Sequence, residues 1–137
     1  MTDLKQEPYC YELKMKVRDY ECDIQGIVNN ANYLHYFEHT RHEFLLSRGV
    51  SFSELHNRGI DAVVVRTEIS FKSSLRPMEE FLSKLYVKKE GVRYVFHQAI
   101  YRLPDNKLCV KALTENVILI NGKLGMCQEL DRVMLEE

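Results

Sequence analysis

The strongest constraint on the fold is that only one long stretch of the chain has a helical hydrophobic period. Between Asn30 and Arg48, apolar residues recur at about 100° per residue and share one broad face, namely Tyr33, Leu34, Phe37, Phe44 and Leu45. Asn29 or Asn30 can cap the start of this helix, and Gly49 follows its end. At roughly 19 residues, the helix would be close to 30 Å long.

The other ordered segments have the period of two that is typical of strands. The first covers 10–17, with Leu13, Met15 and Val17 on one side. After a short expected helix over 51–58, capped by Ser51, further strands are expected over 60–71, 81–89, 92–103 and 107–120. The pair Asn121-Gly122 indicates a hairpin. A short strand end and an amphipathic helix are expected over 126–137.

A sheet with one apolar face needs a cover, and the long helix is the only expected element able to provide it. Residues 1–137 are therefore expected to form a single α+β domain, a curved antiparallel sheet wrapped around one long central helix. One sheet edge and part of one face would stay uncovered. Assembly of a homodimer or homotetramer through the sheet would close them.

Composition excludes several classes of partner. The chain has 19 Lys+Arg against 20 Asp+Glu, a net charge of −1, which argues against nucleic acid. No apolar run approaches the roughly 18 residues of a membrane span, and 1–9 lacks the apolar core of a signal peptide. We therefore expect a cytoplasmic protein without membrane contact. Its four cysteines form no CxxC pair and are expected to be free thiols.

A polar loop over 18–29 joins the first strand to the long helix. Asp23 lies seven residues before Asn30, and Gly26 allows a sharp backbone turn. The first N–H groups of a helix are unpaired and carry partial positive charge. A carboxylate near such donors suits acyl transfer, in which one group attacks or activates water and another stabilises the carbonyl oxygen. An Asp before a helix also serves commonly as a cap.

Residues in and after this loop form a specific pattern: Val17-Arg18, Tyr20, Asp23, Val28-Asn29-Asn30-Ala31, Tyr33-Leu34, Glu38 and Arg41. With this pattern the chain resembles hotdog-fold acyl-CoA thioesterases of the 4-hydroxybenzoyl-CoA thioesterase type, closest to the FadM-like long-chain branch. The resemblance continues more loosely to about Ile120. It implies a hotdog fold for most of the chain.

The resemblance also implies an activity and a site. Such enzymes hydrolyse an acyl-CoA to the free acid and coenzyme A, at a site formed between subunits and without a metal or redox cofactor. Asp23 would be the catalytic carboxylate, acting as nucleophile or as general base. The thioester carbonyl would be held by a helix N-terminal N–H, and the residues expected to bind substrate are Tyr20, Gly26, Asn30 and Tyr33.

Several alternatives stay open. Many relatives have a His after Gly or Gln where this chain has Ile27, and a related branch has His at the position of Asn30. Tyr20 could instead be a packed aromatic, and Asn30 a helix cap. The substrate could be an acyl carrier protein thioester. The same fold could also bind or sense acyl-CoA without catalysis.

Other side chains have two interpretations. His35, His39 and His42 follow one helical stripe, which favours a solvated or inter-subunit face over a metal site. Arg41 lies within the apolar face and is expected to pair with Glu38 or with a loop carboxylate, holding the loop against the helix, with anion binding as the alternative. A group of basic residues could meet the phosphates of coenzyme A or form a solvated sheet face, namely Lys84, Lys88, Lys89, Arg93 and Arg102.

Overall fold

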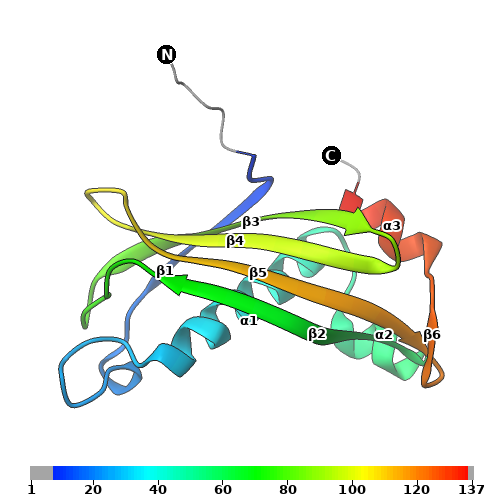
Figure 1. The fold of residues 1–137 in the computed structure, drawn as a ribbon, viewed down its shortest axis with the longest axis horizontal. Helices are drawn as coiled ribbons and strands as arrows, with labels where there is room; N and C mark the ends of the chain where they lie inside the picture. Colours follow the sequence, from blue (N-terminus) through cyan, green and yellow to red (C-terminus); the bar gives the residue numbers. More distant parts are fainter. Residues whose placement is uncertain (1–7, 136–137) are drawn as a thin grey trace.

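The computed structural model describes residues 8–135 and shows a curved antiparallel sheet with one long helix on its inner face (Figure 1). The helices are α1 (Asn30–Ser47), α2 (Phe52–Asn57) and α3 (Gln128–Leu135), with a short 3₁₀ helix at Asp19–Glu21. The strands are β1 (Tyr11–Lys16), β2 (Ile60–Phe71), β3 (Glu80–Glu90), β4 (Arg93–Arg102), β5 (Lys107–Ile120) and β6 (Lys123–Gly125). The predicted α+β architecture is confirmed.

The strands follow one another in the order β1-β3-β4-β5-β2, and β6 pairs with β5. Every pairing is antiparallel. Hairpins join β3, β4 and β5 in turn, and α1 and α2 lie between β1 and β2 in the chain. Strand β2 therefore forms an edge, with a register shift between Val64 and Arg66. Val63, Val64 and Val65 are exposed there, which agrees with the predicted uncovered edge.

Helix α1 begins at an Asn29 cap, whose side chain accepts a hydrogen bond from the Ala31 N–H at 2.9 Å. Its buried side chains join two apolar clusters. Phe44 and Leu45 belong to one, and Tyr33, Tyr36 and Phe37 to the other. The expectation for Leu34 was wrong: its side chain is 45% exposed, because the helix turns this position away from the sheet.

A layer of hydrogen-bonded polar side chains lies between the two clusters. Thr40 Oγ1 and Ser83 Oγ are 2.7 Å apart, which joins α1 to β3. Arg41 Nη1 donates to Gln98 Oε1 at 2.9 Å, and Gln98 Nε2 donates to the Phe37 carbonyl at 3.1 Å. Because all four side chains are buried, the layer fixes where α1 sits along the sheet.

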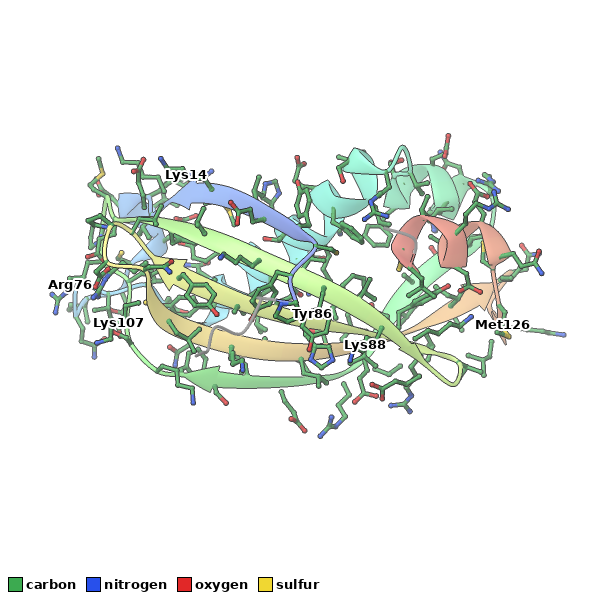
Figure 2. All side chains as sticks on the ribbon, turned by 90° about the horizontal axis from the view of Figure 1, so that it is seen from above. Lys14, Arg76, Tyr86, Lys88, Lys107 and Met126 are labelled. Carbon is green, nitrogen blue, oxygen red and sulfur yellow. The ribbon has the colours of Figure 1, made fainter. Side chains whose placement is uncertain are left out.

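The outer face of the sheet is polar and aromatic. Figure 2 looks onto it, with Tyr86 and Lys88 over the middle of the sheet and Met126 towards one end. The Tyr86 ring stacks on His97 with centroids 4.5 Å apart, and the Lys88 ammonium lies 5.7 Å from the Tyr86 centroid. A cavity of ≈450 Å³ opens beside this stack, lined also by Tyr9.

The chain end and the thiols agree with the sequence. Helix α3 buries Leu130 and Met134 against the sheet, and Asp131 accepts from Lys89 Nζ at 2.8 Å. The last two positions of the predicted helix, 136–137, lie outside the described residues. The four predicted free thiols are confirmed. Among the described helices, none is both long and apolar enough to cross a membrane.

Replacing Phe44 by alanine is expected to lower the free energy of unfolding by about 3–5 kcal/mol, because this fully buried ring would leave a cavity. Urea titration followed by circular dichroism measures the change. Leu46→Ala is the control, since Leu46 is on the same helix but 52% exposed, and it should change the free energy by less than about 0.5 kcal/mol. Equal losses for both variants would contradict this placement of the core.

Candidate functional site

The loop between β1 and α1 is held at both ends by backbone hydrogen bonds. Val17 N donates to the Glu79 carbonyl at 2.9 Å, and Val28 N donates to the Leu75 carbonyl at 2.9 Å. Between these anchors, Cys22 and Val28 form an isolated bridge. The loop is therefore a closed turn at the start of α1, with a fixed path for Asp23.

Asp23 is half-buried within this turn. Its N–H donates to the Ile27 carbonyl, and its own carbonyl accepts from the Gly26 N–H, both at 2.9 Å. The carboxylate oxygen Oδ1 accepts from the Gln25 N–H at 2.9 Å. With the Gln25 amide nitrogen turned towards Asp23, it lies 3.0 and 3.1 Å from the two carboxylate oxygens. Gly26 has φ +76°, so the turn requires a residue that tolerates the left-handed region.

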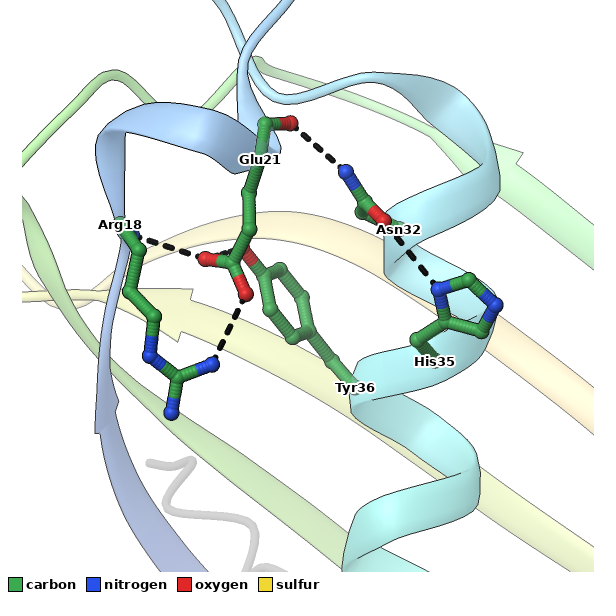
Figure 3. A network of polar contacts seen from close by, with 5 residues as sticks. All are labelled: Arg18, Glu21, Asn32, His35 and Tyr36. Carbon is green, nitrogen blue, oxygen red and sulfur yellow. Dashed lines mark hydrogen bonds and ion pairs between the residues drawn. The ribbon is translucent and has the colours of Figure 1, made fainter.

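A second carboxylate, Glu21, ties the loop to α1 and was not singled out from the sequence. Glu21 is 8% exposed, and Figure 3 shows it between the loop and the helix. Its Oε1 accepts from the Arg18 N–H and the Tyr36 hydroxyl, each at 2.8 Å, and its Oε2 lies 3.0 Å from Arg18 Nη1. Burial raises the pKa of Tyr36 well above its usual range, and the hydrogen bond to Glu21 is the next largest cause of this shift.

The main chain of Glu21 also meets the first turn of α1. Its carbonyl accepts from the Asn29 N–H at 3.0 Å and from Asn32 Nδ2 at 2.7 Å, and Asn32 in turn bonds to His35 Nδ1 at 3.1 Å (Figure 3). One residue thus fixes the helix start through both its carboxylate and its carbonyl. Glu21 positions the loop that carries Asp23.

The predicted substrate contacts occupy different environments. Tyr20 is 79% exposed, so within a single subunit its ring is not packed. Asn30 is the first residue of α1 and is exposed, and the cap is Asn29. Tyr33 is 2% exposed and its hydroxyl accepts from the Leu75 N–H at 3.0 Å. That gives Tyr33 a structural role in anchoring the 72–79 loop.

A groove of ≈640 Å³ runs beside this loop. Tyr20 lines it together with β1, His39 of α1 and Met78. His39 and Met78 were not expected near the loop. Met78 comes close to it because β1 pairs with β3, and no local sequence pattern reveals that pairing. The groove places the exposed Tyr20 ring beside a mixture of apolar and charged side chains.

Arg41 does not hold the loop, and that expectation was wrong. Its hydrogen-bond partner is the neutral Gln98 on β4, since the helix carries Arg41 towards the middle of the sheet. Burial lowers the pKa of Arg41, and the Glu38 charge opposes this shift. Glu38 itself lies 3.9 Å from His42. No group of three metal-binding side chains occurs among residues 8–135.

Most of the basic residues considered for phosphate binding have acidic partners. Lys89 pairs with Asp131 at 2.8 Å. Arg93 and Glu115 are also 2.8 Å apart, and Arg102 lies 2.6 Å from Asp105. Lys84 is 7% exposed and lies 4.9 Å from the centroid of the Tyr101 ring. These contacts favour a charge-paired sheet face over a phosphate site.

Residues 17–133 match the model of the thioesterase-like superfamily. The chain belongs to this superfamily. Two chloroplastic acyl-acyl carrier protein thioesterases of Arabidopsis thaliana, ATL2 and ATL3, are 37% and 36% identical over 112 and 103 residues. These alignments cover 81% and 74% of the chain but only 60% and 54% of the two relatives.

Solved structures agree with this assignment. A hypothetical protein from Aquifex aeolicus superposes with a TM-score of 0.85 at 28% identity, over 90% of this chain and 98% of that one. A 1,4-dihydroxy-2-naphthoyl-CoA thioesterase from Synechocystis has a TM-score of 0.87 at 17% identity, over 92% and 96% of the two chains, and shows the fold alone. The predicted hotdog fold is confirmed.

The Glu21–Tyr36 hydrogen bond is expected to stabilise the loop, because both groups are buried. Tyr36→Phe should lower the free energy of unfolding by about 1–3 kcal/mol, as hydrogen bonds to charged groups do. A double-mutant cycle with Glu21→Leu, which removes the acceptor, measured by urea titration, should give a coupling energy above about 0.5 kcal/mol. Simple additivity of the two changes would show that the bond contributes nothing.

Proposed function

We propose that the protein hydrolyses acyl thioesters and that Asp23 is its catalytic carboxylate. Family membership supports the reaction class. The observation that carries the residue is the closed turn around Asp23, which holds a half-buried carboxylate in the loop that leads into a long helix. A fixed carboxylate next to helix N–H donors is the pair that acyl transfer requires.

Either of two routes is consistent with this geometry. As a nucleophile, the Asp23 carboxylate attacks the thioester carbonyl, releases the thiolate and forms an anhydride that water then hydrolyses. As a general base, it takes a proton from water while that water attacks the carbonyl, and the thiolate leaves. Both routes give one free acid and one thiol. Both require the ionised carboxylate.

The groups around Asp23 suggest how the substrate is held. Asn30 is the first residue of α1, where backbone N–H groups without helical partners can meet a carbonyl oxygen. For Gly26, a substrate contact stays a prediction, because its N–H donates to the Asp23 carbonyl. The Ala31 N–H already donates to the Asn29 side chain. The thioester carbonyl must therefore use the other N–H donors at the start of α1. Tyr20 supplies an exposed ring beside the groove. For Tyr33, a substrate contact stays a prediction, because its hydroxyl is engaged by Leu75.

The carrier of the acyl group is coenzyme A or an acyl carrier protein. Coenzyme A follows from the resemblance to the FadM-like branch, which remains a proposal. The Arabidopsis relatives are named for acyl carrier protein thioesters, which favours the second carrier. Three of the basic residues considered for phosphate binding, Lys89, Arg93 and Arg102, are paired with carboxylates, whereas the groove beside the loop is lined by other basic residues, namely Lys14, Lys16 and Arg18. Both carriers with one acyl group should be compared directly.

We further propose that two copies associate through β2 and that each site is completed by both. Strand β2 is a 12-residue edge with three exposed valines, and an uncovered edge of this kind favours strand pairing. Its far end, Phe71, is 48% exposed and lies 5.8 Å from the Tyr33 ring. The edge therefore extends to the start of α1, near the Asp23 loop.

Asp23→Asn should lower kcat for acyl thioester hydrolysis by about 100-fold or more, because an amide can neither attack nor accept a proton at this pH. Release of the thiol, followed by a colorimetric thiol reagent, measures the rate. Glu90→Gln, at the exposed β3–β4 turn, is the control and should retain the wild-type rate. A folded Asp23→Asn protein with full activity would rule out this role, and binding without turnover in the wild type would favour a non-catalytic domain.

Replacing Val63 and Val65 together by lysine should convert dimers to monomers, because charges on a strand edge oppose pairing. Light scattering measures the mass. Val92→Lys is the control, since Val92 is 41% exposed but lies in the β3–β4 turn. The monomeric variant should also lose most thioesterase activity. Unchanged mass in the double variant would argue against assembly through β2.

A further inference from the structure

A small polar cavity of ≈150 Å³ lies on the inner face of the sheet, between α1, the start of α2 and the strands β2 and β5. Two of the side chains that line it, Arg41 and Asn116, are 9% and 5% exposed. Arg41 follows Asn30 by 11 positions, so it lies roughly 16 Å along α1 from the first turn. The cavity is thus well separated from the Asp23 loop.

Asn116 contributes a buried donor with no acceptor. Its Nδ2 has no hydrogen-bond partner among residues 8–135. Asn116 pairs with Val64 across β5 and β2, and both residues line the cavity. Buried side-chain N–H groups almost always find a partner, because desolvation without one is costly. An unpaired donor in a cavity wall therefore marks a place for an acceptor.

Arg41 adds a second source of donors to the same wall. A guanidinium has five N–H groups, and one nitrogen, Nη1, donates to the neutral Gln98 Oε1 at 2.9 Å. Two donor-bearing side chains, one from α1 and one from β5, therefore converge on a space larger than the roughly 30 Å³ share of one water molecule. The site has room for a few non-hydrogen atoms.

The remaining polar residues decide the charge of the occupant. Glu38 and Asp61 both line the cavity, and Asp61 Oδ1 lies 2.7 Å from His56 Nδ1. Burial lowers the pKa of His42, which also lines the cavity, so its ring is mostly neutral at pH 7. A free anion would meet two carboxylates here. A neutral oxygen acceptor, such as a hydroxyl or a ketone, fits better.

A strip of side chains on β2 connects this cavity with the start of α1. Phe71, Ile69 and Thr67 pair with inner-face residues of β5, so they face α1. The strip begins at Phe71 beside Tyr33 and ends at Val64 in the cavity wall. Phe71 and Val64 are 48% and 45% exposed. Seven residues of strand span roughly 23 Å, a distance suited to a long acyl chain.

We propose that the cavity formed by Arg41 and Asn116 binds a neutral oxygen, a hydroxyl or ketone, carried towards the far end of the acyl chain whose thioester lies at Asp23. This inference rests on the proposed thioesterase function and names its substrate class. The apolar part of the chain lies along the β2 strip. Asn116 Nδ2 and the Arg41 guanidinium then donate to the oxygen.

The test uses acyl-CoAs of one chain length, either plain or with a hydroxyl at successive positions towards the far end, and thiol release as the readout. Wild-type kcat/KM should be highest for one distal hydroxyl position, about fivefold to tenfold above the plain chain. Asn116→Leu should remove this preference, so that kcat/KM is the same for the hydroxylated and the plain chain. Its stability should equal or exceed that of the wild type, because an unpaired donor is removed.

Other outcomes separate the two proposals. Equal kcat/KM for plain and hydroxylated chains at every position, or a preference that survives Asn116→Leu, would overturn the inference but leave the thioesterase proposal intact. Failure to release thiol from any acyl thioester would overturn the function itself. Should Asn116→Leu not fold, Ala62→Leu fills the same cavity from β2 and should abolish the preference. Binding of the free hydroxy acid to Asp23→Asn protein, measured by calorimetry, should likewise exceed that of the plain acid.

Discussion

The polar layer between α1 and the sheet is the interaction on which the rest of the structure depends. An apolar helix face can slide along an apolar sheet at little cost, but Thr40 and Arg41 must meet Ser83 and Gln98 to keep their buried groups satisfied. The layer therefore fixes the position of α1 along β3 and β4. The position of the first turn of α1, and of the turn around Asp23 that precedes it, therefore depends on this layer.

Glu21 fixes the N-terminal end of α1 in a similar way. A buried carboxylate is tolerated only when several donors compensate for its lost hydration, and here Arg18 and the Tyr36 hydroxyl do so. Because one donor comes from the loop and one from α1, the two segments cannot separate without leaving a buried charge. The buried carboxylate of Glu21 thus helps to hold in place the loop that carries the second carboxylate, Asp23, which is more accessible.

The sequence predicted the elements well because their signals are local. Strand β5 and strand β2 have the predicted limits, and Ser51 caps α2 as expected, accepting from the Glu54 N–H at 3.0 Å. The prediction for Arg41 failed because its partner, Gln98, is 57 residues away and polar residues inside strands give no periodic signal. Glu21 was missed because its burial depends on Tyr36, which lies 15 residues further along the chain, and a carboxylate in a polar loop gives no local sign of burial.

The wrapping of one helix by one sheet also explains why the candidate site lies at the periphery. The C-terminal half of α1 is mostly closed in by β3, β4, α2 and α3, so it mainly holds the core and leaves the small cavity beside Arg41 as an opening. The N-terminal half faces β2, an edge strand whose side chains Phe71 and Val64 remain exposed. Exposed apolar side chains of this size along a strand edge favour a covering partner. A second copy and an acyl chain would both satisfy that requirement, because the β2 edge and the β2 strip belong to the same strand. Assembly and substrate binding are therefore expected to depend on one another, while the polar layer keeps the helix fixed in both.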